Sequence, residues 1–448
     1  MREFDELLDR GLAALRDAGG YQGEIYIEER HVLRLAVADT ALESLETQEV
    51  RGAAVRLFHE GRSGFAFTSD LTQAGLTQAV SMAKDLLACT DPEESIALPE
   101  IDESTTPEPE NYDASLGRVD VQDKLSLARR VEEAARAADK RVTKVRQSLY
   151  TDVVGRVGIA STGGLHHSWP FSRVRASIEV VATHEGVSQS GYNEEFAIRF
   201  SALDPVHVGR EAARRATQKL GAESVPTRRA NVVLEPVVAA SLIAGIAPAL
   251  HADNVLKGKS ILGSRLGREV AGPRVRLLDD GRLAGGDGSA AWDDEGVATR
   301  CTLLIETGVL KGFLHSSYTS VRMGTAPTGN VFRRSFSAPP RIAPSNLYLE
   351  PTGISREDLL VQAGDGIYVT EVMGLHTIDT ISGDFSLGAA GTTLKNGRPD
   401  KPVDKIGIAG NLLDLLGSIQ AVATDLKCVP GGGAGSSTLL AGITVSGR

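Results

Sequence analysis

Residues 221–230 read GAESVPTRRA, and this stretch separates two parts of the chain with different patterns. Before it, amphipathic helical segments alternate with strand-like runs. After it, the chain becomes rich in glycine, threonine and short β-type runs. We therefore expect an N-terminal mixed α/β domain over residues 1–225 and a C-terminal domain over residues 226–448. The C-terminal domain is predicted to be a mostly antiparallel β barrel or sandwich, so the fold class is α+β.

The N-terminal domain is predicted to begin with a helix over residues 1–18. Its apolar side chains recur at helical spacing, at Phe4, Leu7, Leu8, Leu12 and Leu15. Three further helices are expected, from Ser69 or Asp70 to about Leu87, over Val121–Ala138 and over Pro205–Leu220. The predicted strands are Glu24–Ile27, Val32–Val37, Val55–Phe58, Gly64–Phe67, Val153–Ala160 and Val174–Val181.

Turn chemistry and proline mark the connections in this domain. Glu60-Gly61-Arg62 and His184-Glu185-Gly186 are predicted to be tight turns. The acidic stretch 91–113 carries four prolines, so it is predicted to be a solvated loop without a packed core.

The C-terminal domain contains mainly short strand-like runs. The predicted strands are Asn231–Leu234, Thr302–Ile305, Asn346–Leu349, Gly366–Val369 and Leu439–Val445. Only two helices are predicted, Pro236–His251 and Asn411–Val422. Pro236 suits the first turn of a helix because that turn needs no amide proton at this position.

Composition excludes several classes of protein. The 448 residues carry a net charge of −10, which argues against a nucleic-acid partner because phosphate binding needs a cationic surface. The three cysteines, Cys89, Cys301 and Cys428, form no Cys-x-x-Cys pair, as expected in a reducing cytosol. The most apolar uncharged run, Pro236–Leu250, has 15 residues, short of the roughly 20 that span a bilayer. We expect a cytoplasmic protein without a membrane partner.

Two groups of acidic residues could take part in metal binding or in acid–base catalysis. The first is a cluster within GDGSAAWDDEG that could hold a hard cation, formed by Asp287, Asp293, Asp294 and Glu295. An acidic loop is the alternative. The second group, His376, Asp379 and Asp384, is compatible with an acid–base set or with a satisfied polar cluster.

An ordered series of short motifs runs through the C-terminal half. The series comprises Ser382-Gly383-Asp384-Phe385-Ser386-Leu387-Gly388, Lys395-Asn396-Gly397, Pro402-Val403 and Ile408-Ala409-Gly410-Asn411-Leu412. Supporting motifs are Val232-Val233-Leu234 before an apolar helix, Asp293-Asp294-Glu295-Gly296, Glu306-Thr307-Gly308-Val309-Leu310-Lys311-Gly312 and Gly442-Ile443-Thr444-Val445-Ser446-Gly447. In this series the chain resembles the TldD/PmbA (TldE) family, historically called modulators of DNA gyrase. The likeness covers most of the chain and is most specific after residue 220.

The resemblance implies a cytosolic protease system built from two types of chain. TldD-type members carry a His-Glu-x-x-x-His zinc helix and a cysteine ligand near the C-terminus. PmbA/TldE-type members lack that motif and pair with TldD-type chains as heterodimers. The pair degrades unfolded or flexible peptides.

This chain departs from the TldD pattern where the zinc helix would lie. Aligned from the strand Val232–Leu234, the motif window is Gly245–Leu250, which contains no metal ligand. Aligned instead on His251, the glutamate position is Ala252 and the second histidine position is Leu256. Neither alignment supplies the ligands and the general base that a zinc peptidase needs.

His251 and Cys428 remain as metal candidates, because the resemblance places a cysteine ligand near Cys428. A complete zinc site draws its binding energy from four ligands, which one histidine and one cysteine cannot supply. We therefore expect no catalytic residue and no cofactor in this chain, and zinc in a TldD-type partner.

Our interpretation is a PmbA/TldE-like subunit of a metalloprotease, pairing as a heterodimer or as a homodimer and binding an unfolded peptide. The peptide would add a strand to a sheet edge of this chain. The residues expected to line the peptide groove are His315, Ser382, Gly383, Asp384, Phe385 and Ser386. For Gly383 and Asp384, a structural turn is an equal alternative.

Two other functions stay open. One is a self-associating scaffold that binds peptides without taking part in proteolysis. The other is a stand-alone hydrolase that uses a metal site at Asp287–Glu295.

Overall fold

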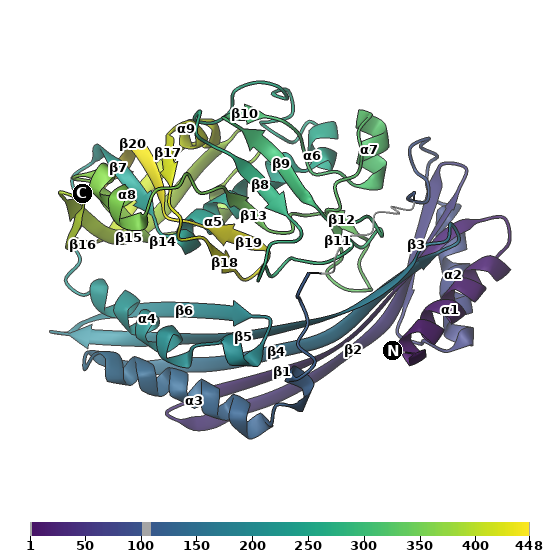
Figure 1. Cartoon of the computed structure of the whole chain (residues 1–448), viewed down its shortest axis with the longest axis horizontal. Helices are drawn as coiled ribbons and strands as arrows, with labels where there is room; N and C mark the ends of the chain where they lie inside the picture. The colour runs from purple at the N-terminus through teal and green to yellow at the C-terminus, as the bar shows by residue number, and fades with distance from the viewer. Residues whose placement is uncertain (1, 101–108, 448) are drawn as a thin grey trace.

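The computed structural model describes residues 2–100 and 109–447 (Figure 1). Its N-terminal part is one antiparallel sheet of six strands in the order β3-β2-β1-β4-β5-β6. The strands are β1 (Gln22–Ala38), β2 (Ala41–His59), β3 (Arg62–Thr68), β4 (Val142–Ser161), β5 (His166–His184) and β6 (Val187–Ala197). In Figure 1 the long strands curve around the C-terminal part, which lies on their concave side.

Helices cover the convex side of this sheet. They are α1 (Arg2–Asp17), α2 (Gln73–Leu87), α3 (Val121–Ala138) and α4 (Pro205–Gln218). Every second side chain of β5 is buried against α3 and α4, namely Val174, Ala176, Ile178, Val180 and Ala182. The alternation places the intervening residues on the concave face. That face is the one turned toward the C-terminal part.

The strands are longer than their apolar patterns indicate. Glu24–Ile27 and Val32–Val37, predicted as two strands, form the single strand β1, which pairs with β2 from Gln22 opposite Phe58 to Ala38 opposite Ala41. The first half of β2 was not predicted. It is exposed on both faces, so no apolar alternation marks it.

The turns are confirmed and one helix start is wrong. Glu60 and Gly61 have positive φ angles, 47° and 72°, as the hairpin between β2 and β3 requires. The start of α2 lies later than Ser69 or Asp70, because Thr72 is the capping residue and its Oγ1 accepts the Gly75 N–H at 3.2 Å.

The stretch 91–113 is only partly described, since residues 101–108 lie outside the described residues. The described remainder docks onto the protein. The Glu93 N–H donates to the Gly61 carbonyl at 2.7 Å, and buried Asn111 donates from Nδ2 to the Ser289 carbonyl at 3.2 Å. The prediction of a wholly solvated loop is therefore wrong at Asn111.

The C-terminal part contains a closed barrel of five strands, in the order β16-β15-β14-β7-β20 and back to β16. Its strands are β7 (Arg228–Leu234), β14 (Ile367–Met373), β15 (Asp384–Lys395), β16 (Arg398–Asn411) and β20 (Thr438–Ser446). Only β7 and β14 pair in parallel. The predicted mostly antiparallel barrel and the α+β class are confirmed. The expected domain division at 225–226 falls in the connection between α4 and β7.

A second sheet packs beside the barrel. Its order is β10 (Val309–Leu310), β9 (Cys301–Glu306), β8 (Leu277–Asp280), β13 (Leu347–Leu349), β19 (Gly433–Gly435) and β18 (Lys427–Val429). A short pair, β11 (Val331–Phe332) and β12 (Arg341–Ile342), lies apart from it, and β17 (Ile419–Val422) joins β20 at the edge of the barrel sheet.

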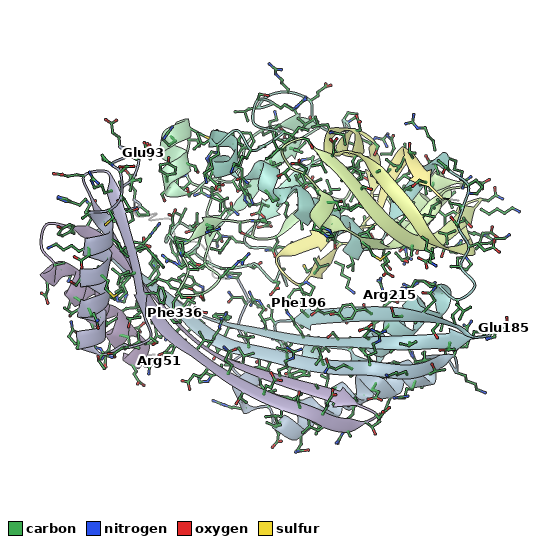
Figure 2. The ribbon with its side chains drawn as sticks, turned by 180° about the vertical axis from the view of Figure 1, so that it is seen from behind. Arg51, Glu93, Glu185, Phe196, Arg215 and Phe336 are labelled. Carbon is green, nitrogen blue, oxygen red and sulfur yellow. The ribbon has the colours of Figure 1, made fainter. Side chains whose placement is uncertain are left out.

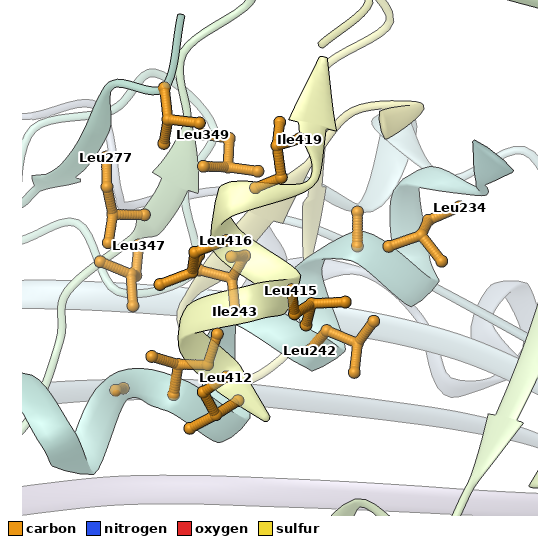
Figure 3. Packing of buried hydrophobic residues seen from close by; sticks show 14 of the residues in the cluster. Leu234, Leu242, Ile243, Leu277, Leu347, Leu349, Leu412, Leu415, Leu416 and Ile419 are labelled. Atoms are coloured by element: carbon orange, nitrogen blue, oxygen red, sulfur yellow. The ribbon is translucent and has the colours of Figure 1, made fainter. Parts of the chain in front are cut away.

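The helix α5 (Pro236–Ile246) fills the space between the barrel and the second sheet. Figure 3 shows Leu242 and Ile243 of α5 beside Leu415 and Leu416 of α9 (Leu412–Gly417) and beside Leu347 of β13. Burying one such side chain contributes about 1.5–3 kcal/mol to folding. The helix is therefore part of the core along most of its length.

Both helix predictions for this part need correction, and three further helices were missed. The predicted helix Pro236–His251 ends at Ile246, because Pro248 lacks the amide proton and crowds the preceding turn. The predicted helix Asn411–Val422 is helical only at α9, after which Ile419–Val422 becomes strand β17. The helices α6 (Ala252–Leu256), α7 (Ser317–Met323) and α8 (Arg356–Ala363) were not predicted.

In the part of the chain that the structure describes, no helix combines the length and the apolar character needed to cross a membrane.

Candidate functional site

The end of α5, where the resemblance places a zinc motif, is filled with apolar side chains. Ile246 and Leu250 are buried, at 2% and 0% exposure. A Cβ atom added to Gly245 would lie 2.5 Å from Cδ1 of Ile378, which packs over this end of the helix. The window therefore contains no ligand, and a side chain at Gly245 would have to displace the end of Ile378.

The two metal candidates do not form a site. His251 begins α6, pairs with Leu314 as an isolated β-bridge, and has an Nε2 atom that is buried without a hydrogen-bond partner. Burial lowers the pKa of His251. Cys428 lies in β18 opposite Ala434, and burial raises the pKa of its thiol.

Zinc does not fit this donor set. Across residues 2–100 and 109–447, no three histidine, cysteine, aspartate or glutamate side chains gather closely enough to hold a metal ion. One buried imidazole nitrogen is too few donors for a tetrahedral site.

Asp287 connects the C-terminal part of the molecule to the N-terminal sheet. Its carboxylate accepts Arg173 Nε at 2.6 Å and Arg175 Nη2 at 2.9 Å from β5. It also accepts the Gly431 N–H at 2.8 Å, which holds the hairpin between β18 and β19. These partners take up both carboxylate oxygens.

The carboxylates 293–295 belong to a second junction. Asp293 accepts the N–H groups of Glu295 and Val297, each at 2.9 Å, and burial raises its pKa well above the usual value. Glu295 pairs with Arg56 of β2 at 3.1 Å and accepts the Ser317 N–H at 2.9 Å.

Glu24 of β1 completes this junction. It lies 2.8 Å from Arg56 and 2.8 Å from Arg333, both of which are largely buried. Asp294 accepts the Arg333 N–H, and burial raises its pKa to about 7. The cluster proposed for a hard cation thus serves as a structural contact between the N-terminal sheet and a loop of the C-terminal part.

The predicted groove run, residues 382–386, comprises a turn at Ser382 and Gly383 and the start of strand β15. Asp379 accepts the Ile381 N–H at 2.8 Å, and these backbone bonds lower its pKa. Asn411 Nδ2 donates to the Ser382 carbonyl and to Asp384 Oδ1, each at 3.0 Å. Gly383 has a φ of 85°, which favours glycine.

The other predicted groove residues lie in different surroundings. Phe385 is 7% exposed within the core, beside a hollow of about 580 Å³ between β16 and β20. Ser386 is exposed and exchanges hydrogen bonds with the Thr377 hydroxyl. His315 is 5% exposed before α7, 3.4 Å from the Thr319 hydroxyl, and burial lowers its pKa. Among the described residues, the hollow beside Phe385 is not lined by His315.

A cleft that the sequence did not predict separates β6 from α5, β14 and β18. It has two adjoining hollows of about 440 and 210 Å³, and Tyr192, Arg215 and Val237 line both of them. Figure 2 labels Phe196 and Arg215 along the side of the N-terminal sheet that faces the C-terminal part. The larger hollow is bounded by β18, and the smaller one by β14.

Two strand edges meet at this cleft. In the described part of the chain, β6 pairs only with β5 and β18 pairs only with β19. Lys427 of β18 reaches across to Glu195 of β6 at 3.0 Å, and His207 of α4 lies 3.2 Å from the same carboxylate. Each edge retains backbone groups that can pair with an added strand.

Ion pairs fix the other side of the cleft. Arg215 of α4 lies 2.6 Å from Glu235, just before α5, and donates to the Thr370 carbonyl at 2.9 Å. Lys219 lies 2.6 Å from Glu371 of β14. Burial raises the pKa of Glu235, although the two arginines beside it oppose the shift. These contacts position α4 and β6 against the barrel.

Comparison with known proteins shows one family along the whole chain. Models of PmbA/TldA metallopeptidase domain 1, central domain and C-terminal domain match residues 23–87, 114–220 and 227–447. Metalloprotease PmbA of Escherichia coli O157:H7 is 27% identical, covering 86% of this chain and 84% of its own length. A metalloprotease TldD homolog of Haemophilus influenzae is 28% identical, covering 83% and 79%. The overall sequence identity to these relatives therefore does not assign the chain to the PmbA type or to the TldD type.

Two crystal structures share the fold over nearly the full length. A Thermotoga maritima protein, described as a proposed modulator of a DNA gyrase, has a TM-score of 0.89 at 29% identity and covers 99% of this chain and 100% of its own. TldE from Thermococcus kodakarensis has a TM-score of 0.88 at 20% identity and covers 98% and 100%.

Proposed function

This chain belongs to the PmbA/TldD metallopeptidase family, and from that premise we propose that it is a PmbA/TldE-type subunit that binds unfolded peptides for proteolysis. In this proposal a TldD-type partner in the cytoplasm supplies zinc, which provides the Lewis acid that polarises the scissile carbonyl and activates water. The present chain supplies a binding surface and no metal ligand.

The end of α5 is the observation that carries the proposal. A catalytic subunit needs two imidazoles and a carboxylate at positions 245, 246 and 250, and these positions hold Gly245, Ile246 and Leu250. Ile246 and Leu250 are part of the core, so ligands there would have to replace packed apolar side chains. A buried carboxylate without a partner costs several kcal/mol, which opposes such a replacement.

The cleft between β6 and β18 supports a peptide-binding role. A strand placed between two sheet edges needs about 4.8 Å on either side and can satisfy its backbone hydrogen bonds with both. Such binding depends weakly on sequence and strongly on flexibility, because only an unfolded segment can extend along an edge. The Lys427–Glu195 ion pair spans this space and must break when a peptide enters.

The proposal is tested by mixing the purified chain with a TldD-type partner and following cleavage of an unstructured fluorogenic peptide. We expect the mixture to cleave much faster than the partner alone, and the isolated chain to be inactive. Tyr192→Ser, in the cleft, should reduce cleavage by the mixture. Val361→Ser, at an exposed position on α8, should not.

Light scattering on the same samples separates the alternatives. A heterodimer with the TldD-type chain supports the proposal. Equal activity of the partner with and without this chain would show that the proposed role is wrong. A stable homodimer that ignores the partner would instead favour the peptide-binding scaffold.

A further inference from the structure

Three side chains of β6 point together into the larger hollow of the cleft. Tyr192, Glu194 and Phe196 are two residues apart, so they share one face of the strand. The intervening residues face α4: a Cβ on Gly191 would lie 2.2 Å from a carbonyl oxygen of that helix, and Asn193 Nδ2 donates to another at 3.4 Å. An aromatic ring, a carboxylate and a second aromatic ring thus follow one another along the wall of the hollow.

The opposite wall of this hollow is partly apolar. Val237, Leu426 and Pro430 of the C-terminal part provide uncharged side chains, and Lys427 lines the hollow beside them. A long aliphatic stem can lie against such a wall while its polar end reaches the other side.

Glu194 is the carboxylate left without a counter-ion in this hollow. Among the described residues, none of the cations around it forms an ion pair with it: Arg175 pairs with Asp287 at 2.9 Å, and Lys427 pairs with Glu195 at 3.0 Å.

The side chains next to Glu194 on β5 and β6 include one cation, Arg175, which is held by Asp287. Directly across the ladder it faces Ser177 of β5. The phenol of Tyr192 is its closest polar neighbour on β6, and burial, followed by the charge of Glu194, raises the pKa of that phenol. Glu194 therefore lies between two aromatic rings without an ion-pair partner among the described residues, in a hollow that Arg215 and Lys427 also line.

We propose that Tyr192, Glu194 and Phe196 form a subsite for a lysine or arginine side chain of the bound peptide. The carboxylate pairs with the cationic head, the two rings offer their π faces to it, and the apolar wall receives the methylene stem. Arginine is favoured over lysine, since its planar guanidinium stacks on aromatic rings and bonds a carboxylate with two parallel donors. This inference rests on the proposed function, because it assumes a peptide in the cleft.

The subsite is tested by binding alone, without cleavage. Fluorescein-labelled unstructured peptides that differ at one central residue, arginine, citrulline, norleucine or glutamate, are titrated with the full chain and followed by anisotropy. Citrulline keeps the shape of arginine and removes its charge. We expect arginine to bind about tenfold tighter than citrulline and glutamate to bind weakest.

Variants of Glu194 and Phe196 test whether these side chains cause the preference for arginine. Glu194→Gln should abolish the difference between arginine and citrulline while leaving citrulline affinity unchanged. Phe196→Leu should reduce the difference. Glu185→Gln, at the exposed turn before β6, should leave it intact.

The outcomes separate the subsite from the proposed function. Equal affinities for arginine and citrulline in the unmodified chain would overturn the subsite while peptide binding stands. Tighter binding of norleucine than arginine would identify an apolar pocket instead. Failure of every peptide to bind would overturn both.

Discussion

Cδ1 of Ile378 lies 2.5 Å from the position that a Cβ atom would take on Gly245. The absence of a side chain at Gly245 lets the turn after β14 close over the end of α5. A histidine at this position, as in a zinc motif, would have to displace the end of the Ile378 side chain. This contact links the missing motif to the fold around it.

The first prediction tests that contact. Gly245→His should destabilise the protein by about 1–3 kcal/mol, since the imidazole must displace Ile378 and the turn that carries it. Ile378→Ala combined with Gly245→His should recover part of the lost stability. Urea denaturation of the parent, the two single variants and the double variant gives the coupling free energy between the two positions. Gly417→His in α9, where nothing lies within 4 Å of an added Cβ, is the matched control. Additive effects of the two changes would contradict the contact.

The second prediction concerns the Asp287 junction. Asp287→Ala should cost roughly 1–3 kcal/mol, because it leaves Arg173 and the Gly431 N–H without their shared acceptor. It should also increase amide hydrogen exchange in β18. Glu110→Ala removes an exposed ion pair with Arg199 and should change stability by less than about 1 kcal/mol. An unaltered exchange rate in β18 would show that Asp287 does not position this edge.

The third prediction is a pH dependence that originates in Asp294. Burial raises the pKa of this carboxyl to about 7, above the value of about 3.9 in an unfolded chain. The folded protein therefore retains a proton that the unfolded chain loses. The resulting stability is complete below about pH 4 and is lost as the pH rises through about 7.

Asp294→Asn removes this contribution. The difference in unfolding free energy between variant and parent should shift in favour of the variant between about pH 4 and pH 7, by up to about 1.4 kcal/mol per pH unit. Chemical denaturation at a series of pH values measures it. Asp400→Asn, on exposed β16, serves as the control. A difference that does not change with pH would contradict the raised pKa.

The sequence predicted elements with a local signal and missed those without one. The helix over Val121–Ala138 has an amphipathic period and an aspartate cap, and the structure has it with the same bounds. The helix α8 has a serine cap and an acidic first turn, at Ser355 and Asp358, which careful inspection could have found. The first half of β2 has no such signal, since neither of its faces is buried.

The candidate cleft could not be predicted because it depends on residues distant in the chain. Lys427 and Glu195 are 232 positions apart and meet only after both sheets have formed. The alternation of Tyr192, Glu194 and Phe196 was visible, but it does not reveal whether that face is solvated or turned to a cleft. The absence of the zinc motif, in contrast, can be recognised from the residue types alone.

The most direct test of the account is the zinc content of the purified chain, measured by mass spectrometry together with peptide cleavage by that chain without a partner. The account predicts far less than one zinc ion per chain and no cleavage that a chelator abolishes. One zinc ion per chain, lost in His251→Ala together with chelator-sensitive cleavage, would contradict it.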